Sequence, residues 1–225
     1  MIFAGQEQLF SQADKPIRLG LLGGTFDPVH FGHLLLAEQA YQQFDLDAVL
    51  FVPTGQPVRK LETVLSSTGD RYEMLVIATS SNPHFFVSRI EMDRPGITYT
   101  IDTVRAMKAV WGDEVELFFI TGIDATYDLG TWKEASSLAS MVTVLSANRG
   151  GVDEENLVKT HVEVGFKVLT FTIPALEISS QHIRASLESG GSVRYLLPEA
   201  VLEYITNRGL YVSEVKEEHL RRYSR

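Results

Sequence analysis

The sequence predicts an α/β fold: a parallel sheet with helices on both faces and a small helical part towards the C-terminus. Six short apolar runs are typical of strands that are buried on both faces. Segments with apolar residues at helical spacing lie between these runs. Strands that alternate with helices indicate a parallel sheet wrapped by helices, in which ligands bind beyond the carboxyl ends of the strands.

The expected strands cover 17–22, 48–52, 85–87, 115–121, 141–145 and 168–173. The expected helices are one that contains Leu34, Ala37, Tyr41 and Phe44, and others over 71–78, 103–111 and 199–206. Pro198 suits the first turn of the last helix and Gly209 its end. Two polar or glycine-rich segments, 55–69 and 148–160, are expected to be long loops.

The composition is that of one globular domain. The 225 residues are 44% hydrophobic and 22% charged, and no apolar run approaches the ~20 residues that a membrane span needs. The first fourteen residues do not resemble a secretory signal, so a cytoplasmic location is expected. Because there is no cysteine, disulfides, thiolate nucleophiles and cysteine-bound zinc are excluded.

The formal net charge of −9 argues against a protein that coats nucleic acid, because that binding requires a basic face. A small polyphosphate can still be held by a few local cations and helix N-termini. Any phosphate ligand is therefore expected to be small.

The most informative stretch runs from Gly23 to His33, directly after the first strand. Adjacent Gly23 and Gly24 at a strand end permit the close backbone approach that a phosphate requires. Asp27 and Pro28 then turn the chain into a helix, whose first turn would place His30 and His33 on the same side.

Other interpretations of this stretch are less consistent with its residues. Taken alone, the two histidines could simply cap and pack the helix. A zinc site would need further ligands, and no cysteine is available. The stretch lacks the lysine of a P-loop and the glycine spacing of the dinucleotide-binding fingerprint.

The segment 24–28 together with 30–33 resembles the signature of the HxGH nucleotidyltransferase superfamily. Residues 178–184, Ile-Ser-Ser-Gln-His-Ile-Arg, resemble its second signature, with Gln181 in place of the usual threonine. Four further segments are similar to the nicotinate-nucleotide adenylyltransferase branch: 94–103, 122–124, 131–132 and 195–201. The chain departs from the family pattern at Ile123 and at 148–150, which affects the neighbouring loop contacts.

The resemblance covers 15–212 and implies one Rossmann-like nucleotidyltransferase domain, between an N-terminal extension (1–14) and a charged C-terminal tail (213–225). It implies transfer of AMP from ATP to nicotinate mononucleotide, giving deamido-NAD and pyrophosphate in NAD biosynthesis. Mg²⁺ is expected to enter with ATP, and no dedicated metal ligand is named. The expected partners are these two substrates, with no nucleic acid and no membrane, and a homo-oligomer is left open.

By resemblance, His30, His33 and Arg184 are the catalytic residues. ATP is expected to contact Gly23, Gly24, Thr25, Phe26, Ser179, Ser180 and Ile183, and the mononucleotide Tyr99, Thr100, Asp124, Trp132 and Lys60. Simpler roles stay open: Ser179 or Thr100 as a helix N-cap, Arg184 and Lys60 as solvated charges, and the two rings as core.

Two rival functions remain. The first is another transferase of the superfamily, such as a pantetheine-phosphate adenylyltransferase or a cytidylyltransferase; the segment 122–132 and the chain length count against it. The second is a nucleotide-binding sensor without turnover, which the intact His30, His33 and Arg184 argue against.

Overall fold

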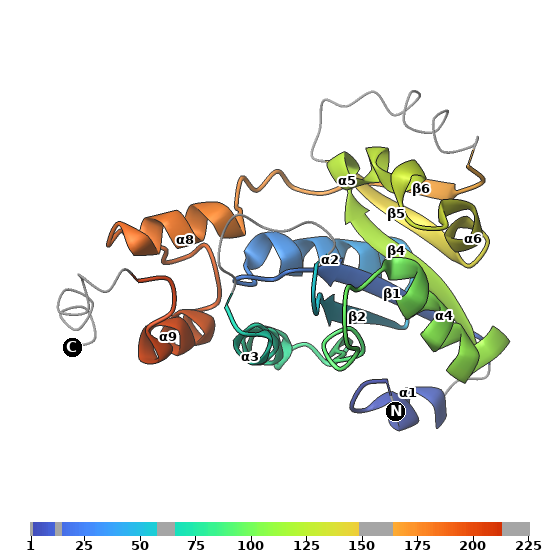
Figure 1. The fold of residues 1–225 in the computed structure, drawn as a ribbon, viewed down its shortest axis with the longest axis horizontal. Helices are drawn as coiled ribbons and strands as arrows, with labels where there is room; N and C mark the ends of the chain where they lie inside the picture. Colours follow the sequence, from blue (N-terminus) through green and yellow to red (C-terminus); the bar gives the residue numbers. More distant parts are fainter. Residues whose placement is uncertain (1, 12–14, 58–65, 149–163, 213–225) are drawn as a thin grey trace.

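A single six-stranded parallel sheet forms the centre of the molecule (Figure 1). The computed structural model describes residues 2–11, 15–57, 66–148 and 164–212. The strands lie in the order β3-β2-β1-β4-β5-β6, which is the order of doubly wound, Rossmann-like sheets. Their bounds are β1 Ile17–Gly24, β2 Ala48–Pro53, β3 Phe85–Val87, β4 Val115–Gly122, β5 Val142–Asn148 and β6 Lys167–Thr172. The predicted fold class is confirmed.

The helices connect the strands and cover both faces. The longer ones are α2 Phe31–Gln43, α3 Thr68–Thr79, α4 Thr100–Trp111, α8 Ser180–Glu188 and α9 Glu199–Arg208. The shorter ones are α1 Gln6–Ser11, η1 Gly112–Glu114, α5 Ile123–Tyr127, η2 Leu129–Thr131 and α6 Ala135–Ala139. None of the described helices has the length and apolar character needed to cross a membrane.

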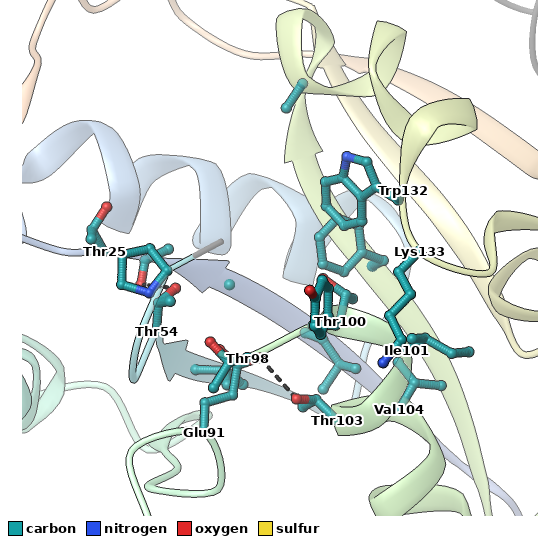
Figure 2. A pocket seen from close by; sticks show the side chains of 18 of the residues that line it. Thr25, Thr54, Glu91, Thr98, Thr100, Ile101, Thr103, Val104, Trp132 and Lys133 are labelled. Atoms are coloured by element: carbon teal, nitrogen blue, oxygen red, sulfur yellow. Dashed lines mark hydrogen bonds between the residues drawn. The ribbon is translucent and has the colours of Figure 1, made fainter. Parts of the chain in front are cut away.

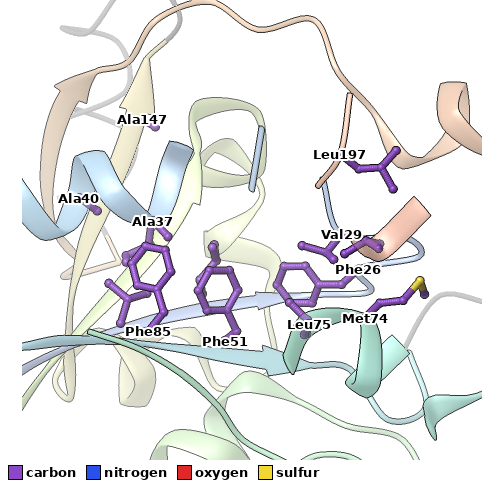
Figure 3. Packing of buried hydrophobic residues seen from close by; sticks show 14 of the residues in the cluster. Phe26, Val29, Ala37, Ala40, Phe51, Met74, Leu75, Phe85, Ala147 and Leu197 are labelled. Atoms are coloured by element: carbon purple, nitrogen blue, oxygen red, sulfur yellow. The ribbon is translucent and has the colours of Figure 1, made fainter. Parts of the chain in front are cut away.

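Alternate strand residues supply two separate cores. Leu22 and Phe51 belong to the core under α2, α3, α8 and α9, whereas Leu21 and Leu50 belong to the core under α4 and α6. In the first core the ring of Phe51 lies between those of Phe26 and Phe85, with centroid separations of 5.8 and 5.3 Å (Figure 3). The turn after β1 is therefore packed into the core through Phe26.

The expected elements need correction at their ends. Helix α4 begins at Thr100 rather than at 103, and Asn148, expected in a loop, is the last residue of β5. Gly69, also expected in a loop, lies in α3. Helix α9 begins at Glu199, so Pro198 is its N-cap rather than part of its first turn. The helix ends before Gly209, the predicted stop, which adopts φ 60°. The rest of the loop expected over 148–160 falls outside the described residues.

Both ends of the described chain pack onto this body. Near the N-terminus, Phe3 is 4% exposed and pairs with Ser88, whose hydroxyl donates to the carbonyl oxygen of Ile2 at 2.7 Å. Near the C-terminus, α9 lies beside α3, where Tyr204 Oη donates to Asp70 Oδ1 at 2.9 Å (Figure 1). The extension and the last helix thus add to the core of the sheet domain.

Candidate active site

A cavity of about 790 Å³ opens at the carboxyl ends of β1, β2 and β4 (Figure 2). Strands β1 and β4 are neighbours, although β2 and β3 intervene in the chain, so this is the point where the strand order reverses. Doubly wound sheets bind ligands at such a point. One side of the cavity is the turn at 23–25, and the other consists of the start of α4 and the segment 128–133.

The turn after β1 is tightly constrained. Phe26 adopts φ 51°, a backbone conformation that residues with a Cβ rarely adopt, and is 2% exposed. A Cβ on Gly24 would lie 3.1 Å from the Phe26 ring, so a side chain there would require the ring to shift. Gly23, Gly24 and Thr25 line the cavity, while the Phe26 side chain, also expected to contact ATP, faces the core.

His30 and His33 form a stacked pair at the start of α2. His30 is the N-cap residue, and the ring centroids are 3.7 Å apart. A Cβ on Gly32 would lie 3.0 Å from the His30 ring, which explains the glycine between them. The backbone N–H of His30 donates to His33 Nδ1 at 3.3 Å. In the neutral His33 ring the proton is therefore on Nε2, which makes that nitrogen a hydrogen-bond donor.

The first turn of α8 packs against the turn that precedes this histidine pair. Ser180 Oγ donates to the carbonyl oxygen of Pro28 at 2.8 Å, and Arg184 Nη1 donates to that of Asp27 at 2.7 Å. The two signature segments are thus in direct contact, through bonds that join residues 152 and 157 positions apart in the chain. Ser179 is the N-cap and accepts from the N–H of His182, as its simpler role predicts, and Ile183 is fully buried.

A buried arginine holds the turn from beneath. Arg71 is 1% exposed, and its guanidinium donates to the carbonyl oxygens of Thr25, Ser66 and Gly55 at 2.9, 3.3 and 3.4 Å. Burial lowers the pKa of Arg71, and the Asp27 carboxylate acts in the opposite direction. Arg71 therefore joins the turn after β1 to Gly55 and Ser66.

Asp27 is the second buried anchor of this turn. It is 1% exposed, and its Oδ1 accepts from Tyr211 Oη at 2.5 Å and from the N–H of Ser66 at 3.3 Å. Burial, reinforced by the bond to Asp27, raises the pKa of the Tyr211 hydroxyl above its usual value. The hydroxyl therefore stays protonated and serves as the donor.

Aromatic rings and the start of α4 form the opposite side of the cavity. Trp132 is half-buried and meets the Phe119 ring edge-on, with centroids 5.5 Å apart. Tyr99 occupies the N-cap position of α4 and Thr100 its first turn, so the alternative assignment of Thr100 as the N-cap is wrong. Because the first N–H groups of a helix have no partner within the helix, they and the positive end of the helix dipole favour an anion here.

A buried acid lies beneath the start of α4. Glu91 is 9% exposed and accepts from Thr103 Oγ1 at 2.8 Å, and Arg94 Nη1 donates to the same hydroxyl oxygen at 3.1 Å (Figure 2). Burial raises the pKa of Glu91, while the bond from Thr103 opposes that rise. These contacts fix the segment 91–98, which borders the cavity, to α4.

Of the described residues that were expected near the mononucleotide, Asp124 is not among those that line this cavity. Asp124 is exposed in the first turn of α5, while Ala125 and Asp128 from the same segment line the cavity. Ile123, a departure from the family pattern, is 5% exposed and packs in the interior. Lys60 lies outside the described residues. Within the described part of the chain, no three His, Asp or Glu side chains are grouped so as to hold a metal ion.

Comparison with known proteins identifies the family of this chain. The family model described as cytidylyltransferase-like matches residues 21–186. A probable nicotinate-nucleotide adenylyltransferase of Thermoanaerobacter sp. is 44% identical, covering 88% of this chain and 96% of the relative. One from Moorella thermoacetica is also 44% identical, with 88% and 93% covered. The chain belongs to the nicotinate-nucleotide adenylyltransferase family. It is therefore a nucleotidyltransferase.

A solved structure has the same fold as this member of the nicotinate-nucleotide adenylyltransferase family. The Plasmodium falciparum nicotinic acid mononucleotide adenylyltransferase complexed with NaAD superposes with a TM-score of 0.72. The two chains are 20% identical, with 87% of this chain and 97% of that one covered.

Sequence reasoning missed several residues of this adenylyltransferase site. Lys133 lines the cavity and directly follows Trp132, so its position beside a predicted ring could have revealed it. Arg71 and Glu91 gave no such signal, because their burial depends on contacts made only in the folded chain.

Proposed function

We propose that this chain transfers the adenylyl group of ATP to the phosphate of nicotinate mononucleotide, giving deamido-NAD and pyrophosphate, a step of NAD biosynthesis. The names of its relatives at 44% identity support this reaction. The observation that carries the proposal is the position of the cavity. It extends from the glycine turn of the first signature segment, which the second segment contacts at Asp27 and Pro28, to a wall of aromatic rings at a helix N-terminus.

The proposed reaction needs no covalent intermediate. A phosphate oxygen of the mononucleotide attacks the α-phosphorus of ATP, the bond from that phosphorus to the α,β-bridging oxygen breaks, and pyrophosphate leaves with the electron pair. The nucleophile is already an anion, so the protein's task is to position the reactants and stabilise charge.

Three side chains are proposed to act on the triphosphate. His33 Nε2–H donates to an oxygen on which charge develops, and His30 stacks on the His33 ring and holds its orientation. Arg184 uses one nitrogen on the Asp27 carbonyl and directs the remaining N–H groups of its planar fork to the β- and γ-phosphates. Thr25 and the start of α8, with Ser179 and Ser180, complete this end of the site.

ATP is proposed to bind as its magnesium complex. Mg²⁺ prefers phosphate oxygens and water and needs few protein ligands, and it neutralises charge on the leaving pyrophosphate. The buried Asp27 carboxylate is already engaged by Tyr211 and Ser66, so the proposal gives it a structural role.

The pyridine ring is proposed to lie against Trp132 and Tyr99, with its carboxylate at the first turn of α4. There the Thr100 hydroxyl and the helix N-terminus supply donors. A carboxylate only accepts hydrogen bonds, whereas the NH₂ of an amide would face these donors unpaired.

Isotope labelling tests which group of ATP is transferred. With ATP labelled at the α-phosphorus, the label should enter the dinucleotide, and with ATP labelled at the γ-phosphorus it should enter pyrophosphate. Labelled orthophosphate, or an α-label that never reaches the mononucleotide, would contradict adenylyl transfer.

The substitution Arg184→Lys should lower kcat/KM for ATP by roughly 10- to 100-fold, the value of a hydrogen bond to a charged group. Lysine keeps the charge but cannot bond both the Asp27 carbonyl and a phosphate in a planar fork. Arg194→Lys is the matched control, because Arg194 pairs with the exposed Glu199. If both variants show the parent's kcat/KM, Arg184 has no role in binding phosphate.

The substitution Trp132→Ala should raise KM for the mononucleotide about 2- to 10-fold, the value of an aromatic ring contact. The preference between nicotinate and nicotinamide mononucleotides should be unchanged, because a ring wall contacts the shared pyridine. Initial rates at saturating Mg-ATP, with Trp132→Phe as the conservative variant, measure both quantities. An unchanged KM in Trp132→Ala would remove Trp132 from the acceptor site.

A further inference from the structure

The charges that line the cavity are unbalanced for an anionic ligand. Glu91 and Asp128 are acids, and Lys133 is the one lysine or arginine among the described residues that line it. The proposed acceptor carries both a phosphate and a carboxylate. A single cation near Tyr99 and Trp132 would therefore contribute strongly to binding such an anion, because close charges interact strongly where water is partly excluded.

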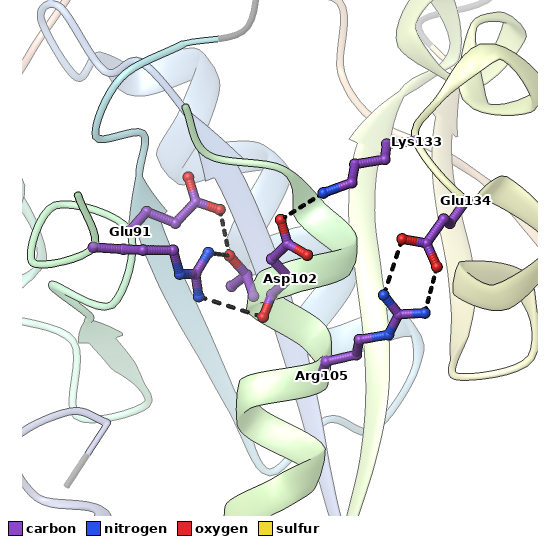
Figure 4. A network of polar contacts seen from close by, with 7 residues as sticks. Glu91, Asp102, Arg105, Lys133 and Glu134 are labelled. Atoms are coloured by element: carbon purple, nitrogen blue, oxygen red, sulfur yellow. Dashed lines mark hydrogen bonds and ion pairs between the residues drawn. The ribbon is translucent and has the colours of Figure 1, made fainter. Parts of the chain in front are cut away.

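The ammonium group of Lys133 is held at the start of α4. Its Nζ lies 3.1 Å from Asp102 Oδ2 and 4.3 Å from the centroid of the Tyr99 ring (Figure 4). The Lys133 side chain is 41% exposed and that of Asp102 32%, so this ion pair is weak and can be rearranged. Three N–H donors on a flexible stem allow Lys133 to contact Asp102 and a ligand together.

The backbone that carries Lys133 is anchored independently. The next residue, Glu134, adopts φ 53°, and both of its carboxylate oxygens accept from the guanidinium of Arg105 on α4 (Figure 4). This contact ties 132–134 to the helix whose N-terminus faces the cavity. The ammonium group can therefore adjust to a ligand without displacing Trp132.

We propose that Lys133 is a specificity-determining residue, whose ammonium group pairs with the carboxylate of the acidic mononucleotide while it remains beside Asp102 and Tyr99. This inference rests on the proposed function. Lys133 adds a charge to the donors of the helix N-terminus, and this charge favours a carboxylate over a neutral amide. Its contribution is to binding, at a distance from the phosphorus that reacts.

The test compares parent and Lys133→Met with nicotinate and nicotinamide mononucleotides at saturating Mg-ATP. Methionine keeps an unbranched stem against Tyr99 and removes the charge. KM for the nicotinate form should rise about tenfold, with kcat within twofold and KM for the nicotinamide form unchanged. Lys133→Arg keeps the charge and should retain most of the preference.

Arg105→Met serves as the matched control. It removes the other ion pair of the same wall, but Arg105 does not line the cavity, so both acceptors should be affected alike. Equal rises in both KM values for Lys133→Met, or an unchanged preference, would overturn the role of Lys133 alone. A parent that uses neither mononucleotide would overturn the proposed function, and this inference with it.

Discussion

The substitution His33→Ala is expected to lower kcat by about 10²- to 10³-fold, with little change in the dissociation constant for ATP. The reason is the assigned proton position. The His30 N–H bonds Nδ1 of His33, so Nε2 carries the hydrogen that can meet charge developing in the transition state. Loss of one such donor costs ~2.7–4 kcal/mol in the rate.

Single-turnover rates and ATP titrations of folded protein measure the two effects separately. The control is His84→Ala, because His84 is exposed and stacks on Tyr41 rather than on the pair of His30 and His33. Thermal unfolding checks the packing of His33 against the Phe26 ring. A folded His33→Ala protein with the parent's kcat would remove His33 from the mechanism.

The second large effect is on stability. The substitution Arg71→Met is expected to lower the free energy of unfolding by ~3–5 kcal/mol, because it leaves three part-buried carbonyl oxygens without their donor and removes the charge that faces the buried Asp27 carboxylate. For a chain of this size the fall in Tm is roughly 6–20 °C.

A matched substitution at an exposed arginine separates the effect of losing buried contacts from the effect of losing a charge. Arg89 is 49% exposed and pairs with the exposed Asp93 four residues later, so Arg89→Met should cost about 1 kcal/mol or less. Denaturant unfolding of both variants gives the comparison. Equal stabilities for Arg71→Met and Arg89→Met would show that the buried contacts of Arg71 do not hold the turn.

The sheet could be predicted closely because its strands are buried on both faces and therefore consist of apolar runs. Helix α9 could be predicted from a local signal at its end, because Gly209 adopts the left-handed conformation that terminates the helix. The start of α4 was missed because its N-cap is Tyr99, which lacks the capping oxygen that marks a helix start in sequence. Helices α5 and α6 have five residues each, too few for periodicity to be detected.

The candidate site was predicted unevenly for similar reasons. Gly24 and His33 belong to a compact local pattern whose spacing has a geometric meaning. Arg71, Glu91 and Lys133 acquire their positions from contacts between distant segments, for which the local pattern gives no signal. Asp124 was expected at the acceptor, yet the segment turns so that Ala125 and Asp128 line the cavity.

The measurement that tests the central claim most directly is product formation with each acceptor. The purified protein is incubated with Mg-ATP and, separately, nicotinate mononucleotide, nicotinamide mononucleotide or 4′-phosphopantetheine, and dinucleotide and pyrophosphate are quantified. The account predicts deamido-NAD and pyrophosphate in equal amounts, with kcat/KM at least about tenfold higher for the nicotinate form than for the nicotinamide form. Equal kcat/KM for the two pyridine nucleotides, or faster reaction with phosphopantetheine, would contradict it.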